Sequence, residues 1–360
     1  MNLLKTPHIH SLMGPILITG HTGFKGTWMT LLLEKLGIDV VGYSLPPEKD
    51  SLFDRANRTG AIVEKFADIR DFKEVGDFIH KYKPSAIFHM AAQPLVLESY
   101  HIPRETFDVN VMGTVNLLDS AFACESVEAI VVITTDKVYR NDNSGRAFIE
   151  SDPLEGKDPY SASKVGTEAA VAAWQQIAKI SGGPKVISTR AGNVIGGGDW
   201  SKHRIMPQLV RNLLKHEPIQ IQNPNSTRPW MHVLDSLHGY LLVLDAVLKG
   251  EIIEAINFGP TEFGLSVKDL VEFSILGWTE PCDISFPIIQ STQCLEAIHL
   301  QLDSTMARTR SGLKWKPYWS QQEAGQATLI WWDRVINKSL NAVEACHLDM
   351  EALESRIQLG

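Results

Sequence analysis

Cysteine is scarce in this sequence. Its 360 residues include only four cysteines, at Cys124, Cys282, Cys294 and Cys346. No two of them form a C-x-x-C pair, which argues against a disulfide framework and against a cysteine-based metal site. We interpret them as reduced, mostly buried thiols of a cytoplasmic protein that holds no metal.

Long apolar runs and an excess of positive charge are also absent. No apolar stretch reaches the ~20 residues that a membrane-spanning helix needs. The net charge is −8, which argues against a nucleic-acid partner, so arginines would have to bind any anionic ligand locally. Residues 1–13 lack a signal-peptide core. His8 and His10 could bind a metal, but a flexible leader is the simpler interpretation of this segment.

Strand and helix patterns alternate through the first half of the chain. Apolar runs at 40–43, 85–90, 129–133 and 186–189 are separated by helical patterns near 71–82, 104–123 and 159–180. This alternation predicts an α/β protein with a Rossmann-type, doubly wound parallel sheet over residues 14–190. The regularity ends near Gly196. Residues 191–360 are therefore expected to form mainly a smaller C-terminal substrate domain, with some segments returning to the sheet.

A glycine-rich turn follows the apolar run 16–18. Gly20, Gly23 and Gly26 have the spacing G-x-x-G-x-x-G, and a helical pattern begins directly after them. Glycines in such a strand-to-helix turn let backbone N–H groups approach a pyrophosphate at the start of the helix. The alternative is an ordinary tight turn. The position between a strand and a helix favours dinucleotide binding.

Tyr160 and Lys164 lie four residues apart, a spacing that places both on one face of a helix. Asp158 and Pro159 predict that this helix begins just before them. An ammonium beside a phenol lowers the tyrosine pKa, and such a tyrosine can take a proton from an alcohol near neutral pH. Taken alone, the pair could equally be part of a solvated helix face.

The apolar run 129–133 ends in polar residues. Thr135 could hydrogen-bond a substrate hydroxyl, and Asp136 and Lys137 could act as an acid/base pair. A turn with a solvated lysine is the alternative. The convergence of this strand end, the glycine turn and the Tyr160 helix on one sheet edge favours a catalytic site.

These motifs resemble the extended short-chain dehydrogenase/reductase family and, within it, the CDP-glucose 4,6-dehydratase group. The resemblance runs from about residue 14 to the C-terminus. Thr-Asp-Lys at 135–137 separates this group from the dTDP-glucose dehydratases, which have a glutamate in the lysine position. The similar segments are ITGHTGFKGTW (18–28), HMAAQPLV (89–96), NVMGTVNLL (110–118), TTDKVY (134–139), DPYSASK (158–164), RAGNVIGGGDW (190–200) and NPNSTRPWMHVLD (223–235).

The resemblance implies a role for individual residues. It implies that NAD is bound by Gly20, Thr22, Gly23, Phe24, Lys25, Gly26, Asp68, Ile69, Ala91, Ala92 and Gln93, together with Tyr160 and Lys164. It gives the catalytic set as Thr135, Asp136, Lys137, Tyr160 and Lys164, and the substrate-binding set as Gln93, Thr135, Asn193, Arg204 and Arg228. From the residues alone, Asn193 could be a turn residue, and the two arginines could form surface ion pairs.

The implied activity is that of a hydro-lyase. It would convert a nucleoside-diphosphate hexose, with CDP-glucose as the first candidate, to the 4-keto-6-deoxy sugar and water in deoxysugar and O-antigen/lipopolysaccharide biosynthesis. Two alternatives stay open: a nucleotide-sugar 4-epimerase or reductase, and a non-catalytic cofactor-binding scaffold. The resemblance also implies a cytoplasmic homodimer, joined through a four-helix interface made by residues 110–118 and 160–174.

The chain departs from the group's pattern at three places. Leu97 stands where an arginine is common, Met231 stands where a glutamine is common, and residues 140–148 lack the usual tryptophans. In addition, residues 40–44 contain neither an acidic residue for the ribose of NAD nor an arginine for the phosphate of NADP. These positions lie near the expected sugar, base and ribose, so they bear on the identity of the ligands.

Overall fold

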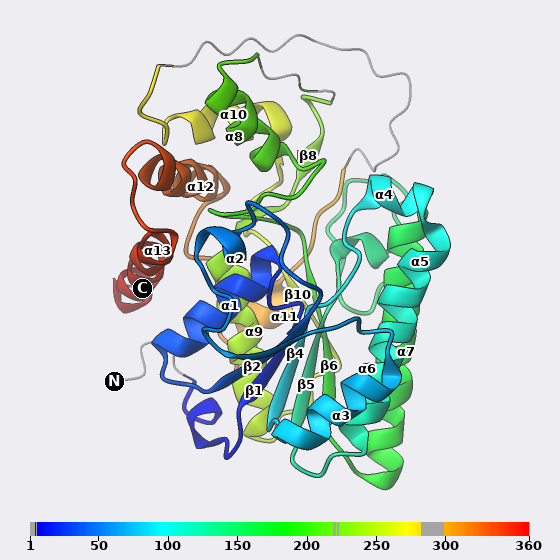
Figure 1. The fold of residues 1–360 in the computed structure, drawn as a ribbon. Coiled ribbons are helices and arrows are strands. Elements are labelled where there is room, and N and C mark those ends of the chain that lie inside the picture. Colours follow the sequence, from blue (N-terminus) through cyan, green and yellow to red (C-terminus); the bar gives the residue numbers. More distant parts are fainter. Residues whose placement is uncertain are drawn as a thin grey trace.

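The computed structural model describes residues 4, 6–218, 221, 223–281, 299–310 and 312–359. Its centre is a seven-stranded sheet in the order β10-β6-β5-β4-β1-β2-β3, and every neighbouring pair is parallel. The predicted Rossmann-type parallel sheet is therefore confirmed (Figure 1). The strands are β1 (Ile16–Thr19), β2 (Val40–Ser44), β3 (Val63–Phe66), β4 (Ala86–His89), β5 (Ala129–Ile133), β6 (Lys185–Ala191) and β10 (Ala255–Phe258).

The apolar runs form strands because helices cover the sheet on both faces. Every residue of β1, β2, β4 and β5 is buried, as expected for a parallel sheet between two helical layers. Helices α1 (Phe24–Lys35) and α9 (Val233–Leu248) lie on one face, and α3 (Phe72–Tyr82), α6 (Gly113–Phe122) and α7 (Pro159–Ser181) lie on the other (Figure 1).

The predicted helices occur, with one difference. The helical pattern at 104–123 is divided into α5 (Pro103–Phe107), a π-helical turn η2 (Asp108–Met112) and α6. Two strands were not predicted. β3 is half exposed at the sheet edge, so it lacks an apolar run, and β10 comes from the second half of the chain.

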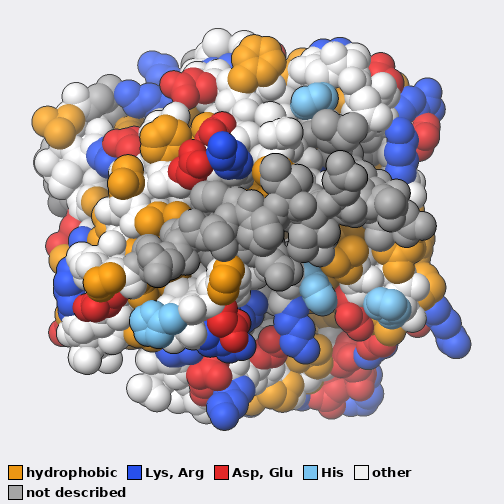
Figure 2. Space-filling view, turned by 90° about the horizontal axis from the view of Figure 1, so that it is seen from above, with side chains coloured by type: hydrophobic (Ala, Val, Ile, Leu, Met, Phe, Trp, Pro, Cys, Tyr) orange, Lys and Arg blue, Asp and Glu red, His pale blue; other side chains and the backbone are white. Residues whose placement is uncertain are grey.

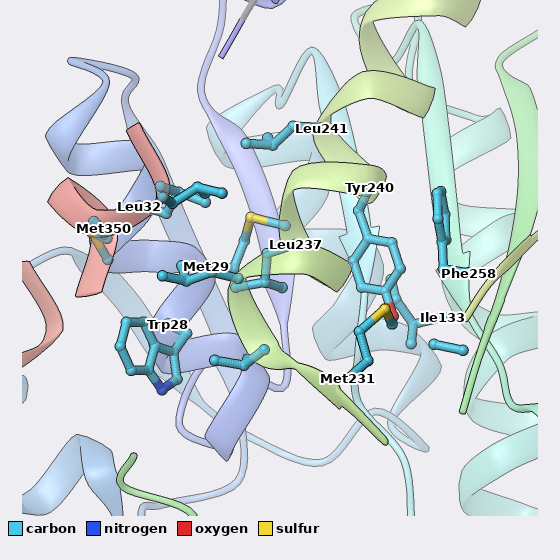
Figure 3. Packing of buried hydrophobic residues seen from close by; sticks show 14 of the residues in the cluster. Trp28, Met29, Leu32, Ile133, Met231, Leu237, Tyr240, Leu241, Phe258 and Met350 are labelled. Atoms are coloured by element: carbon cyan, nitrogen blue, oxygen red, sulfur yellow. The ribbon is translucent and has the colours of Figure 1, made fainter. Parts of the chain in front are cut away.

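Described parts of the second half of the chain, among them residues 205–215, 227–228 and 267–275, lie above the strand ends, and α9 and β10 return to the sheet (Figure 1). Figure 3 shows Leu237 and Leu241 of α9 packed against Met29 and Leu32 of α1. The second part contains β7 (Asn193–Ile195), α8 (Ile205–Lys215), β8 (Thr227–Arg228), β9 (Trp230–His232), β11 (Leu265–Ser266), α10 (Val267–Ile275), α11 (Thr305–Thr309), α12 (Gln321–Ile336) and α13 (Ala342–Leu359).

The N-terminal segment differs from the expected flexible leader. Residues Ile9–Ser11 form a helical turn, η1, and Leu4 and Ile9 are buried in the main core. The carboxylate of Asp245 on α9 accepts hydrogen bonds from the backbone N–H groups of His8 and Ile9 and pairs with the His8 ring. His8 therefore holds the segment to α9, and the prediction of a flexible leader is wrong for the part that the structure describes.

Several surface and composition features complete the description. In the described residues, no helix is long and apolar enough to cross a membrane, and no group of acidic, histidine and cysteine side chains could hold a metal ion. Cys124 and Cys346 are buried free thiols, whereas Cys282 and Cys294 lie outside the described residues. Acidic and basic side chains are interspersed over the visible described part of the face in Figure 2.

Candidate active site

The glycine turn packs tightly against the segment that follows β4. Gly20 has a φ of +73°, and a Cβ there would lie 2.8 Å from the backbone nitrogen of Ala91. A Cβ on Gly26 would lie 2.1 Å from the Gly20 carbonyl oxygen. No side chain caps the N-terminus of α1, which begins directly after Gly23. These features fit a turn whose backbone N–H groups bind a dinucleotide pyrophosphate.

The residues expected around the adenosine have defined partners. Arg70 binds the Asp68 carboxylate through Nε (3.0 Å) and NH2 (2.6 Å), which lowers the pKa of that carboxyl. Ile69 is buried and packs over Gly113 of α6. Thr22 bonds Ser44 at the end of β2, at 2.8 Å between hydroxyl oxygens. Thr22 therefore lies in the glycine turn after β1 and Asp68 lies just after β3, on either side of β2 in the sheet.

Ala91, Ala92 and Gln93 follow β4. The backbone nitrogen of Ala91 donates to Thr19 Oγ1 at 3.2 Å. The Gln93 side chain is engaged within its own loop, because its Oε1 accepts from Leu95 N (2.6 Å) and its Nε2 donates to Thr106 Oγ1 (2.9 Å). Gln93 therefore shapes the loop through its side-chain amide.

Tyr160 lies in the first turn of α7. Asp158 caps the helix by accepting from Ser161 N at 2.8 Å, and Ser99 Oγ of α4 (Val96–His101) accepts from Tyr160 N at 3.1 Å. The Tyr160 hydroxyl is hydrogen-bonded to Thr135. Burial raises the pKa of Tyr160 to about 12, although Thr135 and Arg204 act in the opposite direction.

The pKa of Tyr160 is raised by burial in this structure and not lowered as expected, and Lys164 is bonded to the end of β5. Its Nζ donates to the backbone carbonyl of Ile133 in β5 at 3.1 Å. Burial lowers the pKa of Lys164 to about 8, and Glu168 partly opposes this shift. The pair is on one helix face as expected, but the lysine reaches the strand end and not the phenol.

Thr135, Asp136 and Lys137 form the loop that leaves β5. Thr135 Oγ1 donates to Asp136 Oδ1 at 3.0 Å and accepts from Lys137 N at 3.3 Å. Thr135 and Asp136 are buried, and Lys137 is half-buried. This places a carboxylate and an ammonium on one short turn, next to the hydroxyl of Tyr160.

Lys25 of the glycine turn is partly buried beside these groups. Its Nζ donates to the Tyr240 hydroxyl of α9 at 3.2 Å. Burial, together with Arg204 and Lys164, lowers the pKa of Lys25 to about 7, while Asp136 acts to raise it. Sequence analysis did not predict Tyr240 as a site residue, although the nearly continuous apolar run of α9 indicates a helix that is buried on all sides.

Three of the five expected substrate-binding residues lie in the second part of the chain. Asn193 begins β7, which pairs with β9, so it belongs to a strand and the turn alternative is wrong. Arg204 precedes α8 and bonds Asp199 at 3.1 Å, with its side chain 35% exposed. Arg228 is buried in β8 and donates to the Thr227 carbonyl at 2.9 Å, which is not the geometry of a surface ion pair.

Met231 and Leu97 are two of the places where the chain departs from the pattern of the dehydratase group, and their surroundings differ. Figure 3 shows Met231 beside Tyr240 and Ile133, in the buried cluster under the strand ends. Leu97 on α4 is 40% exposed. Met231 therefore makes the floor of the site apolar, whereas Leu97 leaves an apolar side chain at the surface.

Comparisons with known proteins agree with this geometry. The CDP-glucose 4,6-dehydratase of Salmonella typhimurium strain LT2 is 38% identical over 325 residues, which cover 88% of this chain and 89% of that protein. The dTDP-glucose 4,6-dehydratase of Haemophilus influenzae Rd is 28% identical over 260 residues, covering 68% and 74%. The chain matches both proteins over more than two thirds of their length.

Solved structures share the fold. The NAD complex of dTDP-glucose 4,6-dehydratase from Bacillus anthracis Ames superposes with a TM-score of 0.73 at 22% identity, covering 90% of this chain and 98% of that one. MoeE5 in complex with UDP-glucuronic acid and NAD gives 0.73 at 25% identity, covering 91% and 100%.

The region that contains the sheet, the glycine turn, the β5 loop and α7 is also the region that a family model recognises. That model matches residues 16–259, from the first residue of β1 to the residue after β10. With its sheet order, its strand-end site and this match, the chain belongs to the NAD dependent epimerase/dehydratase family.

Proposed function

We propose that the protein is an NAD-dependent nucleotide-sugar 4,6-dehydratase, a hydro-lyase that acts on CDP-glucose. The observation that carries the proposal is the turn Thr135–Asp136–Lys137, which sets a carboxylate and an ammonium beside Tyr160. The Salmonella relative, at 38% identity over 88% of the chain, supports the reaction and the nucleotide.

The cofactor would lie along the ends of β1, β2 and β4. Gly20, Gly23 and Gly26 would hold the pyrophosphate, with Thr22, Phe24 and Lys25 around it, Asp68 and Ile69 at the adenine, and Ala91, Ala92 and Gln93 along the loop after β4. NAD, when bound, accepts a hydride from the sugar and returns it.

Tyr160 would take the proton of the sugar 4-OH, with Thr135 holding both groups in register through its hydroxyl. The 4-ketone acidifies the proton at C5, which Lys137 in its neutral form, or a water that it holds, would remove. Asp136 in its protonated form would donate a proton to the departing 6-OH, which leaves C6 as water. The hydride taken from C4 returns to C6 and a proton returns to C5. The two protons given up by the 4-OH and C5 replace the one that Asp136 donates and the one that returns to C5, so the net loss is one water.

The substrate diphosphate would meet a positive region. Lys25 lies near Arg204, Lys164 and Asp136, and Arg228 of β8 would add a further cation, in a protein whose net charge is −8. Asn193 would contribute an amide to the same phosphates. Locally arranged cations of this kind attract a nucleoside diphosphate despite the negative total charge.

A 4-epimerase would need Tyr160 but not Asp136 and Lys137, and a scaffold would need none of the three. Asp136→Asn and Lys137→Met, each given CDP-glucose in a single turnover, separate these activities. Both variants should still reduce bound NAD at a rate near that of the wild type, because oxidation at C4 uses Tyr160.

Elimination should then slow by roughly 10²–10⁴, the usual contribution of a positioned proton-transfer group, and bound NADH should accumulate with a 4-keto hexose. Stopped-flow absorbance and deuterium incorporation at C5 measure the two steps. Wild-type rates of 6-deoxy product in both variants would refute the dehydratase assignment. The same assay with dTDP-, UDP- and GDP-glucose tests the nucleotide.

We also propose a cytoplasmic homodimer that serves deoxysugar and lipopolysaccharide O-antigen biosynthesis. Apolar side chains are exposed on the helices that the resemblance places in a four-helix interface. Phe107 of α5, Met112 of η2, and Ile177 and Ile180 of α7 are 41%, 49%, 42% and 77% exposed. Their burial against a second copy would remove apolar surface from water.

A further inference from the structure

A buried ion pair lies behind the β5 loop. Glu168 of α7 and Arg190 of β6 have side chains that are 5% and 6% exposed. Arg190 Nε donates to Glu168 Oε1 at 2.9 Å, and NH2 donates to Oε2 at 2.8 Å. This two-bond contact fixes both the distance and the relative orientation of the two side chains.

The pair is bonded to both ends of the loop that carries Asp136 and Lys137. At the start of the loop, Thr134 Oγ1 donates to Glu168 Oε1 at 2.6 Å. At its end, Arg190 NH1 donates to the Tyr139 hydroxyl at 2.8 Å. One ion pair therefore holds the residues that flank Thr135, Asp136 and Lys137 on either side.

The pair also ties this loop to the helix of Tyr160. Glu168 follows Lys164 by four residues, one turn further along α7. The bond from Thr134 to Glu168 therefore fixes the loop after β5 relative to α7, the helix that carries Tyr160 and Lys164. Ser188 Oγ of β6 adds a further bond to Glu168 Oε2 at 2.9 Å.

The side chains at the Tyr139 end of the loop also have hydrogen-bond partners. The Tyr139 hydroxyl donates to Asn257 Oδ1 of β10 at 2.7 Å, and its ring stacks on Phe148 with 5.1 Å between centroids. Arg190 NH1 also reaches the backbone carbonyl of Glu150 at 2.9 Å. Fully satisfied buried polar networks of this kind make a region rigid and give it one arrangement.

Stability alone is a weak reason for such a pair, because desolvation of two buried charges offsets much of their attraction. Placement is a stronger reason, since a shift of ~1 Å in a reacting group can cost roughly 10²-fold in rate. We propose that Glu168 and Arg190 are positioning residues that set Asp136 and Lys137 against the C5–C6 edge of the sugar while Tyr160 faces its 4-OH. This inference rests on the proposed dehydratase function.

Two variants each remove one anchor and leave the ion pair intact. Thr134→Val removes the bond to Glu168. Tyr139→Phe removes the bond from Arg190, and with it the bond to Asn257, while it keeps the ring stacked on Phe148. Thr134→Ser restores the hydroxyl. Thr328→Val on α12 is the matched control, because it deletes a buried threonine hydroxyl that bonds Ala324 O at 2.8 Å outside the site.

Two readouts are made on the NAD-loaded protein. The first is amide hydrogen exchange over residues 135–140, which needs no turnover. Exchange should rise at least tenfold in Thr134→Val and Tyr139→Phe but not in Thr134→Ser or Thr328→Val. The second is single-turnover kinetics with CDP-glucose, in which elimination should slow roughly 10–100-fold. The C4 oxidation rate should change by no more than about threefold, so that bound NADH accumulates.

The outcomes test the positioning role of Glu168 and Arg190 separately from the proposed dehydratase activity. Unchanged exchange in both anchor variants overturns the positioning role, as does an equal slowing of oxidation and elimination. If wild-type protein eliminates no water from any nucleotide sugar, the proposed function fails. The exchange measurement still decides in that case whether the ion pair anchors the loop.

Discussion

Replacing Lys164 with methionine should stabilise the protein while it abolishes turnover. Burial lowers the pKa of Lys164 from 10.5 to about 8, so the folded protein disfavours the charged lysine at neutral pH. A lysine pKa lowered from 10.5 to about 8 corresponds to roughly 3 kcal/mol of lost stability. The variant also loses the bond to the Ile133 carbonyl, worth ~1 kcal/mol, which leaves a net gain of ~2 kcal/mol at pH 7.

The gain should depend on pH with a definite sign. The folded-state pKa lies below the unfolded-state value, so the penalty is fully present below about pH 8, where both states carry the charge. Between pH 8 and 10.5 the folded protein loses its proton while the unfolded chain keeps it, so the penalty shrinks as the pH rises and is gone above pH 10.5. At pH 10 the remaining penalty is below ~1 kcal/mol, so the variant should lose its advantage.

The assay is thermal unfolding of wild type and Lys164→Met at pH 7, 8, 9 and 10. The variant should melt a few degrees higher at pH 7, and the difference should fall steadily as the pH rises. Lys81→Met, at an exposed lysine, controls for the loss of one positive charge. The reasoning would be refuted if the variant were no more stable than wild type at pH 7, or if the difference in melting temperature did not change with pH.

Three further predictions concern the proposed reaction and assembly. Tyr160→Phe should keep the fold, shown by an unchanged circular dichroism spectrum, and lose roughly 10²–10⁴ in turnover, and near-normal turnover would contradict its role as base. Wild-type protein should release 4-keto-6-deoxy sugar without a net rise in NADH absorbance, because the hydride returns to the sugar; NADH formed in step with product would indicate a plain dehydrogenase. The protein should scatter light as a dimer at micromolar concentration, and Met112→Glu should yield monomers because a charge replaces an exposed apolar side chain on η2; a wild-type monomer would count against the interface.

Much of the fold could be predicted from the sequence, because continuous apolar runs indicate which strands are buried. The strands at 40–44, 86–89 and 129–133 are buried on both faces, and such strands appear as continuous apolar runs. The exposed edge strand β3 has a mixed pattern and was missed for the same reason. The N-terminal segment was judged from its polar composition, whereas its position is fixed by Asp245, 237 residues away from His8.

The site could be predicted as a set of motifs, but the bonds between them could not. Sequence analysis placed Tyr160, Lys164 and the β5 loop at one edge of the sheet, because the carboxyl ends of parallel strands lie at the same edge. The partner of Lys164 is a backbone carbonyl, and the partner of Lys25 is Tyr240, both chosen by packing between distant segments. A pKa follows from burial and partners, so the direction of the shift in Tyr160 needed the structure.

The position of β10 limits how this protein can be recombined with its relatives. The strand is contributed from residues 255–258, yet it closes the sheet beside β6, and its Asn257 fastens the loop after β5. A chimera with a single junction after β6 would therefore take β10 and the residue at position 257 from the relative, together with the new substrate-binding residues. Exchanging specificity while preserving the catalytic loop calls for at least two junctions, with α9 and β10 kept from the parent and the segments on either side replaced.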